Sequence, residues 1–207
     1  MRVKINSIII AAAMLLVAGT VNAQNYINAG YGRAADRITF GNMEPENESF
    51  NTVFAGFSHN FVFGKTFGLE AGINFVHGFN NDRDELPGLK SNLHFSSYAF
   101  NAPILLNCGI PVSDFLNLKL LVGPTLHYGL SCKTDSIVNG EKAYTIDYYG
   151  ENSYNRFYVS AGAALAAELS NKFRLKIGYD FGLTDIDHAE KVSLKENLLS
   201  FTVSYIF

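Results

Sequence analysis

Apolar and polar residues alternate along the final segment of the chain, from Leu199 to Phe207. Large apolar or aromatic side chains occupy its odd-numbered positions, and serine or threonine occupies positions 200, 202 and 204 between them. Because successive side chains of a β-strand point to opposite faces, this pattern predicts a strand with one apolar face and one small polar face. A strand of this kind that ends in an aromatic residue is typical of a barrel that crosses a membrane.

The same period of two recurs along the chain and predicts eight strands, and no helical period of useful length occurs after residue 23. In the segment 173–184, the apolar odd-numbered residues from Phe173 to Leu183 oppose charged residues that include Arg174 and Asp180. The eight predicted strands cover residues 25–34, 50–60, 67–79, 93–109, 116–131, 154–169, 173–184 and 197–207.

Alternation alone leaves open which face lines the inside, since a soluble barrel of the lipocalin type would bury its apolar face. Two features favour an apolar face that points outward. The polar face consists mainly of Gly, Ala and Ser with few long charged side chains, unlike a sheet that faces water. In addition, the predicted strands approach or exceed the roughly 9–11 residues that cross a bilayer obliquely.

The connections between the predicted strands alternate in length. Short turns follow the second, fourth and sixth strands, and long polar segments follow the others, as expected when the tight turns and both termini lie in the periplasm. The sequence therefore predicts an all-β fold, an eight-stranded antiparallel up-and-down transmembrane β-barrel that is closed by pairing of its first and last strands. The long segments are Gly41–Ser49, Asn80–Asn92, Cys132–Ser153 and Asp185–Glu196.

The start of the chain has the pattern of a secretory signal peptide. Two basic residues precede an apolar run from Ile8 to Val17, and small residues lead up to Ala23. The run is shorter than the roughly 20 apolar residues of a membrane-spanning helix, so we expect cleavage rather than an anchor. We therefore expect a signal peptide over residues 1–23 and one barrel domain over residues 24–207, located in the cell outer membrane.

Composition and charge narrow the possible partners. Charged residues make up 17% of the chain, below the usual ~25%. Without the two basic residues of the predicted signal peptide, 14 positive side chains (16 − 2) face 19 negative ones, a net charge of −5, which gives no support for a nucleic-acid partner. We expect Cys108 and Cys132 at opposite ends of adjacent strands, too far apart for a disulfide.

Three segments carry a family resemblance: residues 98–106 (Tyr98-Ala99-Phe100-Asn101-Ala102-Pro103-Ile104-Leu105-Leu106), the pair Gly123-Pro124, and residues 178–186 (Gly178-Tyr179-Asp180-Phe181-Gly182-Leu183-Thr184-Asp185-Ile186). With them, the chain after residue 23 resembles the outer-membrane β-barrel family common in Bacteroidetes, described as porin-like or PorT-like. The resemblance implies a barrel in outer-membrane lipid and indicates no particular activity. Tyr205 and Phe207 resemble the signal read by the barrel-assembly machinery, although the glycine often found upstream is absent.

The inward face of the predicted barrel carries charges of both signs. An eight-stranded barrel is just wide enough for its own side chains to fill, and buried charges need partners. We therefore expect a network of ion pairs that stiffens the barrel, with a narrow solute channel (porin-like) lined by the cationic members as the alternative. The predicted interior charge network consists of Glu70, Lys119, His127, Arg156, Glu168, Arg174, Lys176 and Asp180.

No catalytic, cofactor-binding or metal-binding pattern emerges from the sequence. A lipid A acyl-modifying enzyme would need a serine beside a histidine that acts as its base. The acidic stretches 82–85 and 185–190 lack the spacing of a calcium loop. Polar positions at a membrane interface are the better interpretation of the candidate residues His59, His77, His94, Ser96, Ser97 and His127.

We therefore expect a non-enzymatic protein without a cofactor, with a structural or surface-recognition role. Its outer segments, chiefly Cys132–Ser153, would meet an extracellular ligand that the sequence does not identify. For the tyrosines of this region, an aromatic girdle at the membrane interface is favoured over binding anchors. Asp135-Ser136-Ile137 in the same segment resembles the O-glycosylation sequon of Bacteroides relatives. The tyrosines are Tyr144, Tyr148, Tyr149 and Tyr154.

Overall fold

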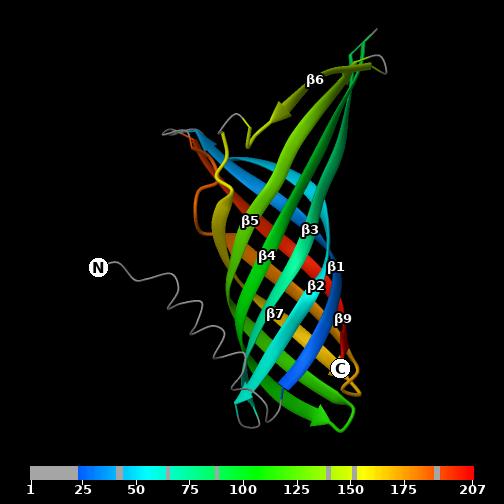
Figure 1. Cartoon of the computed structure of the whole chain (residues 1–207), viewed down its shortest axis with the longest axis vertical. Helices are drawn as coiled ribbons and strands as arrows, with labels where there is room; N and C mark the ends of the chain where they lie inside the picture. The colour runs from blue at the N-terminus through cyan, green and yellow to red at the C-terminus, as the bar shows by residue number, and fades with distance from the viewer. Residues whose placement is uncertain are drawn as a thin grey trace, which may run out of the picture.

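The computed structural model describes residues 23–40, 44–63, 66–86, 89–138, 141–150, 153–188 and 192–207. Within these ranges nine antiparallel strands form one sheet, and eight of them close into a ring in which β1 pairs with β9 and β4 pairs with β5 (Figure 1). The predicted eight-stranded barrel, closed by its first and last strands, is confirmed. The strands are β1 (Ala23–Phe40), β2 (Glu46–Phe63), β3 (Phe67–Leu86), β4 (Leu89–Ser113), β5 (Leu116–Val138), β6 (Glu141–Asp147), β7 (Phe157–Leu169), β8 (Phe173–Gly182) and β9 (Val192–Ile206).

The apolar face of each of the eight strands in the ring points outward, as predicted. On β5, Leu118, Leu120 and Val122 are exposed, whereas Lys119 and Leu121 between them are buried. Aromatic residues flank this aliphatic band, as is typical of barrels that sit in a bilayer. Phe67, Phe115, Phe173 and Tyr205 lie at the end with the tight turns, and Tyr31, Tyr98, Tyr128 and Phe157 lie toward the other end.

The two ends of the barrel differ in shape. At one end, which we call the turn end, short connections join β2 to β3, β4 to β5 and β7 to β8. At the opposite end, the arm end, β3, β4 and β5 continue past the aromatic residues and β6 pairs with the last residues of β5 (Figure 1). We call this extension the raised arm (residues 80–86, 89–96, 132–138 and 141–147).

The raised arm corrects the predicted connections. Residues expected to form the loops Asn80–Asn92 and Cys132–Ser153 largely continue the β-ladder, and β6 is a ninth strand inside the second of them. All of the first five residues of β6, Glu141–Thr145, are exposed, so no apolar face marks this strand in the sequence. A strand that is exposed to water on both faces is held by its backbone hydrogen bonds and lacks the alternation that identifies the other strands.

The predicted signal peptide lies outside the described residues, apart from the backbone of Ala23. In the part of the chain that the structure describes, no helix is long and apolar enough to cross a membrane.

The turn between β7 and β8 depends on two left-handed residues. Ser170 and Asn171 have φ values of 50° and 52°, and Lys172 N–H donates to the Leu169 carbonyl at 3.0 Å. Two positive φ values define the type I′ turn, whose twist matches that of the flanking strands. Asn accepts this conformation because its short polar side chain hydrogen-bonds locally, whereas a β-branched residue is strained there.

We predict that Asn171→Val destabilises the barrel by about 1–2 kcal/mol, the cost of a left-handed conformation for a branched side chain. The midpoint of urea unfolding in detergent measures this loss. Lys172→Val is the matched control, because it places the same side chain next to the turn, and it should shift the midpoint much less. Equal shifts for the two variants would contradict the role assigned to the positive φ of Asn171.

Candidate functional site

An ion pair between opposite strands spans the lumen near the turn end of the barrel. Arg174 on β8 and Glu70 on β3 come from strands that face each other across the ring of eight. The Arg174 guanidinium binds both Glu70 carboxylate oxygens, at 2.5 Å and 3.0 Å, and both side chains are completely buried. Bidentate geometry of this kind is the strongest form of a charge-assisted hydrogen bond.

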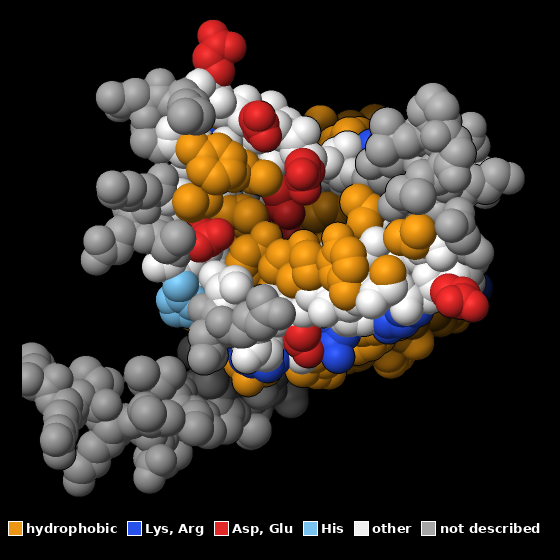
Figure 2. Space-filling model, turned by 90° about the horizontal axis from the view of Figure 1, so that it is seen from above, with side chains coloured by type: hydrophobic (Ala, Val, Ile, Leu, Met, Phe, Trp, Pro, Cys, Tyr) orange, Lys and Arg blue, Asp and Glu red, His pale blue; other side chains and the backbone are white. Residues whose placement is uncertain are grey.

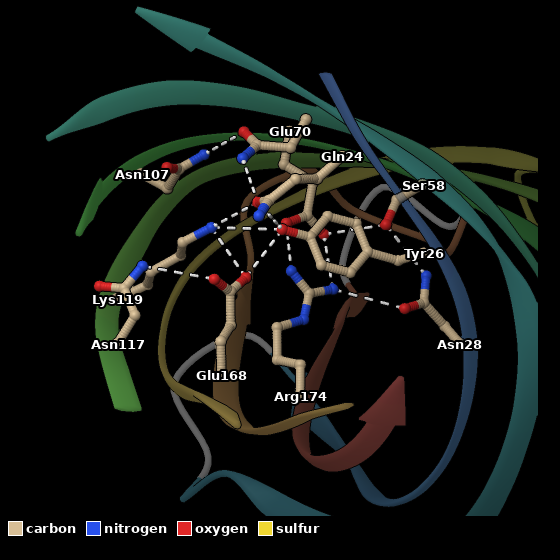
Figure 3. Close-up of polar contacts among 11 residues, drawn as sticks. Gln24, Tyr26, Asn28, Ser58, Glu70, Asn107, Asn117, Lys119, Glu168 and Arg174 are labelled. Atoms are coloured by element: carbon tan, nitrogen blue, oxygen red, sulfur yellow. Dashed lines mark hydrogen bonds and ion pairs between the residues drawn. The ribbon is translucent and has the colours of Figure 1, made fainter. Parts of the chain in front are cut away.

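Tyr26 links this pair to a second one. Lys119 on β5 and Glu168 on β7 form an ion pair at 2.7 Å, and the Tyr26 hydroxyl donates to the same Glu168 oxygen at 2.8 Å. The Arg174 guanidinium lies 3.8 Å from the centroid of the Tyr26 ring, a cation–π contact. Figure 3 shows these side chains converging on the barrel axis from several strands, with amide and hydroxyl groups around them. We call this set (Tyr26, Glu70, Lys119, Glu168 and Arg174) the lumen plug.

Neutral polar groups complete the plug. Ser58 donates to Glu70 at 3.1 Å, and Asn28 donates to Ser58 at 3.1 Å, while the Gln24 carbonyl accepts from Lys119 at 3.1 Å. The sequence pattern does not identify these residues or Tyr26, because the glycines of β1 and β2 obscure which of their side chains point inward. Their signal was present, since Asn28, Ser58 and Asn60 are polar residues at alternate positions that a lipid-facing strand would not carry.

The structure places seven of the eight residues of the predicted interior network on the inner face. Five are buried, and Lys176 and Asp180 line a small cavity of about 70 Å³ on the arm side of the plug. Arg156 does not join them. It lies just before β7, at the rim, where its guanidinium donates to the Gly129 and Leu130 carbonyls and stacks 4.5 Å above the Tyr149 ring. Arg156 lies outside the start of β7, so the alternation of that strand does not turn its side chain inward.

A wider cavity opens at the arm end. It encloses about 490 Å³ and is lined on one side by Glu48, Asp36 and Glu196. These residues lie on the adjacent strands β2, β1 and β9, and Asp36 is the register partner of both glutamates. Figure 2 looks into this end and shows acidic side chains inside a hollow that apolar side chains surround. We call this cavity the vestibule.

Tyrosines form another wall of the vestibule. Tyr148, Tyr149 and Tyr154 line it together with Tyr158 of β7, so the predicted girdle position of the first three is wrong. Tyr148 and Tyr154 stack at 4.6 Å, and the Tyr149 hydroxyl packs over Gly129, where a side chain would collide with it. Tyr148 and Tyr149 follow β6 directly and line the vestibule. The strand pattern of the sequence could not reveal this position. Tyr144 on β6 stays exposed.

The vestibule lies beyond the outward aromatic residues and holds carboxylates that prefer their neutral form. Burial, reinforced by Glu196 and Glu48, raises the pKa of Asp36 well above its usual range. Burial also raises the pKa of Glu196 from 4.5 to about 7, although the hydrogen bond donated by Tyr158 at 3.0 Å acts in the opposite direction. The Cys132 thiol is buried, which raises its pKa to about 12 and leaves it unreactive.

His127 has a serine neighbour, but not one of the predicted serines. His127 Nε2 lies 2.8 Å from Ser160 Oγ, and its Nδ1 lies 3.0 Å from Asn101 Oδ1. This order of groups resembles a nucleophile, a base and an orienting amide. However, His127 and Ser160 are buried in the lumen, where a lipid acyl chain outside the barrel does not reach them. Among the other candidates, His77 contacts the backbone carbonyl of Ser97 rather than a hydroxyl.

The remaining candidate chemistry is structural. Cys108 is a register partner of Phe67 at the turn end and Cys132 lines the vestibule, and both thiols are free. Within the described ranges, no group of three or more His, Cys, Asp or Glu residues is arranged to hold a metal ion. The Asp185 carboxylate accepts from the backbone N–H of Leu194 at 2.7 Å and so shapes its own loop. Ser136 is buried, so its side chain is not presented to a modifying enzyme.

Comparison with protein families assigns the fold. The family model described as outer membrane protein beta-barrel domain matches residues 17–188. The chain belongs to this outer-membrane β-barrel family. The outward apolar band therefore lies in outer-membrane lipid, the turn end faces the periplasm, and the raised arm and vestibule are extracellular.

Solved structures with a similar fold are distant in sequence. Ail, the attachment invasion locus protein of Yersinia pestis, solved in complex with the heparin analogue sucrose octasulfate, is 12% identical with a TM-score of 0.48, over 90% of this chain and 100% of that one. OprG from Pseudomonas aeruginosa is 9% identical with a TM-score of 0.45, over 89% and 96%. Neisserial surface protein A is 12% identical with a TM-score of 0.44, over 90% and 99%. At these values the similarity carries no argument about function, and no curated protein sequence matches the chain significantly.

We predict that Arg174→Met destabilises this outer-membrane barrel by about 3–5 kcal/mol, because Glu70 is left as a buried charge without its partner. Urea unfolding in detergent, followed by the loss of heat-modifiable gel migration, measures the change. Arg33→Met is the control, because Arg33 is exposed and its substitution should cost less than about 1 kcal/mol. Similar losses for the two variants would contradict the plug.

We predict that the extracellular half loses stability as the pH rises. The pKa of Glu196 is about 7 in the folded protein, above its ordinary value of 4.5. The contribution of protonated Glu196 to the free energy of unfolding is therefore complete below pH 4.5 and is lost as the pH rises through about 7. Asp36 on β1, Tyr158 on β7 and Asp180 on β8 act on Glu196, and Asp36 shifts in the same direction. The unfolding midpoint should therefore fall between about pH 5 and pH 8.

Glu196→Gln should flatten this pH dependence, because glutamine keeps an acceptor for Tyr158 and has no charge to develop. Glu141→Gln on exposed β6 is the matched control and should leave the wild-type slope. An unfolding midpoint of the wild-type protein that rises over the same pH range would contradict the predicted direction of the pH dependence.

Proposed function

We propose that this outer-membrane barrel is a non-conducting, non-enzymatic protein that recognises a ligand at its extracellular end. The observation that carries the proposal is the contrast between the two halves of the lumen. The periplasmic half is filled by the lumen plug, whereas the extracellular half opens into the vestibule beneath the raised arm. Such a shape offers a binding surface to the outside of the cell and no route through the membrane.

The plug argues against the alternative of a narrow solute channel. Arg174, Glu70 and Glu168 have almost no accessible surface, and the first two join opposite sides of the ring. A water-filled channel needs about twice as many strands, as in the porins of 16–18 strands. Ions would therefore have to break a buried, hydrogen-bonded pair to pass.

The position of the Ser160–His127 pair argues against a lipid-modifying enzyme. A lipid substrate lies outside the barrel, whereas both side chains point inward, and neither lines the vestibule. Acyl transfer needs a free nucleophile within reach of the reacting carbonyl. The hydrogen bonds from Asn101 through His127 to Ser160 instead connect β4, β5 and β7 within the wall.

The raised arm presents a second extracellular surface beside the vestibule. Its ladder is tied by surface ion pairs, Lys142–Asp135 at 2.8 Å and Lys133–Asp147 at 3.1 Å, and β6 pairs with β5 alone in the described sheet. An edge strand of this kind can extend a sheet into a partner.

The remaining sequence-based assignments belong to the same proposal. Residues 1–23 act as a cleaved signal peptide, Tyr205 and Phe207 are read by the barrel-assembly machinery during insertion, and the chain belongs to the Bacteroidetes branch of the family. The outward positions of Tyr205 and Phe207 on the lipid side support recognition of an exposed aromatic edge.

We predict that the purified protein shows no stable single-channel openings in planar bilayers, because the plug closes the lumen. The double substitution Glu70→Ala with Arg174→Ala removes both charged side chains of the cross-lumen pair and should produce measurable ion flow. Steady, charge-selective conductance of the wild-type protein would overturn the proposal in favour of a channel.

A further inference from the structure

Three acidic side chains form a row in the vestibule, and none of them forms an ion pair with a described cation. Glu48, Asp36 and Glu196 follow one another across β2, β1 and β9 on the inner face. None of the ion pairs among the described side chains involves any of the three. Ionised carboxylates directly opposite each other on neighbouring strands repel, so the row is unfavourable unless protons or a cation compensate its charge.

Asp36 is the member of the row that most needs a partner. Its Oδ1 atom has almost no accessible surface and accepts no hydrogen bond. A buried carboxylate oxygen without a donor is costly, and native proteins keep such atoms where a partner completes them. The Asp36 side chain lines the vestibule, so a ligand that enters from outside the cell can reach this carboxylate.

The cations near the vestibule are already engaged. Arg33 is among the residues that line the vestibule, but its exposed side chain donates to Asn51 at 3.1 Å and to Ser49. Arg156 donates to the carbonyls of Gly129 and Leu130. Among the described side chains, these two do not neutralise the acidic row.

The tyrosine wall opposite suits a cation with an apolar body. Tyr148 and Tyr154 are stacked on each other, and Tyr158 donates to Glu196. Tyr149 already holds one cation, since the Arg156 guanidinium lies 4.5 Å from its ring centroid. Tyrosine faces attract ammonium groups by about 0.5–2 kcal/mol each, and aromatic cages bind quaternary ammonium ligands in this way.

We propose that the vestibule binds a small organic cation, an alkylammonium or quaternary ammonium group, with its charge at Asp36 and Glu196 and its alkyl part against the tyrosine wall. The inference rests on the proposed function, because it names the ligand class of the extracellular end. A volume of about 490 Å³ is within the usual range for a small-molecule site. A bare metal ion fits less well, because the described carboxylates form no metal-binding group.

Choline tests the proposal against its neutral isostere 3,3-dimethyl-1-butanol, which has the same shape without the charge. The purified barrel in detergent at about pH 8 and low salt is titrated with each, and tyrosine fluorescence is read, because the chain has 11 Tyr and no Trp. We expect saturable binding of choline and at least tenfold weaker binding of the isostere.

Asp36→Asn should weaken choline binding at least tenfold, because it removes the carboxyl group that ionises to pair with the bound cation and keeps the shape. Glu141→Gln, which removes a carboxylate on exposed β6, should change the affinity less than twofold. Heat-modified gel migration checks that both variants fold. Tyr154→Leu should weaken choline binding and not that of the isostere.

Three results would overturn the inference: no choline binding by the wild-type protein, equal binding of choline and its isostere, or an Asp36→Asn variant with wild-type affinity. Complete displacement of choline by equimolar Na⁺ or Ca²⁺ would also overturn it, in favour of a simple ion site. Each of these results leaves the proposed function standing if the protein does not conduct. Steady conductance of the same preparation would instead overturn the proposed function.

Discussion

The ion pair between Arg174 and Glu70 determines how the two halves of this barrel differ. It joins strands on opposite sides of the ring, and Tyr26 and the Lys119–Glu168 pair fill the space around it. Two charges taken out of water are tolerated only when both are paired and hydrogen-bonded, and here Ser58 donates to Glu70 while Asn28 accepts from Arg174. The plug therefore fills the periplasmic half of the lumen, and removal of either charge would leave the other buried without a partner.

The plug determines the shape of the extracellular end, which becomes a cavity with a floor. On the extracellular side of the plug, none of the ion pairs among the described side chains crosses the axis, and the inner face of β1, β2 and β9 lines the vestibule. Tyr148, Tyr149 and Tyr154, which follow β6, line part of this opening. Acidic and aromatic groups thus face each other in a dead-end site, which favours binding over transport.

Most strands of the barrel could be predicted from the sequence, whereas the structure of its extracellular end could not. The strands of the ring were predictable because one face contacts lipid and the other a packed lumen. Apolar and polar residues therefore alternate along each strand, as in β8 and β9. The raised arm was not, because β6 is wet on both faces and shows no such period. Arg174, Glu70 and Glu168 were predicted as interior charges, but their pairing depends on which strands oppose each other across the ring. The vestibule tyrosines, Tyr148 and Tyr149 among them, follow a change of direction after β6 that no local pattern records.

A double-mutant cycle between Glu70 and Arg174 tests the central claim most directly. The unfolding free energies of wild type, Glu70→Met, Arg174→Met and the double variant are compared in one detergent. We predict a coupling of about 3–5 kcal/mol, with each single variant strongly destabilised and the double variant close to the more stable single variant or above it. Additive losses, with coupling below about 0.5 kcal/mol, would show that the two side chains do not depend on each other and that the lumen is not closed in this way.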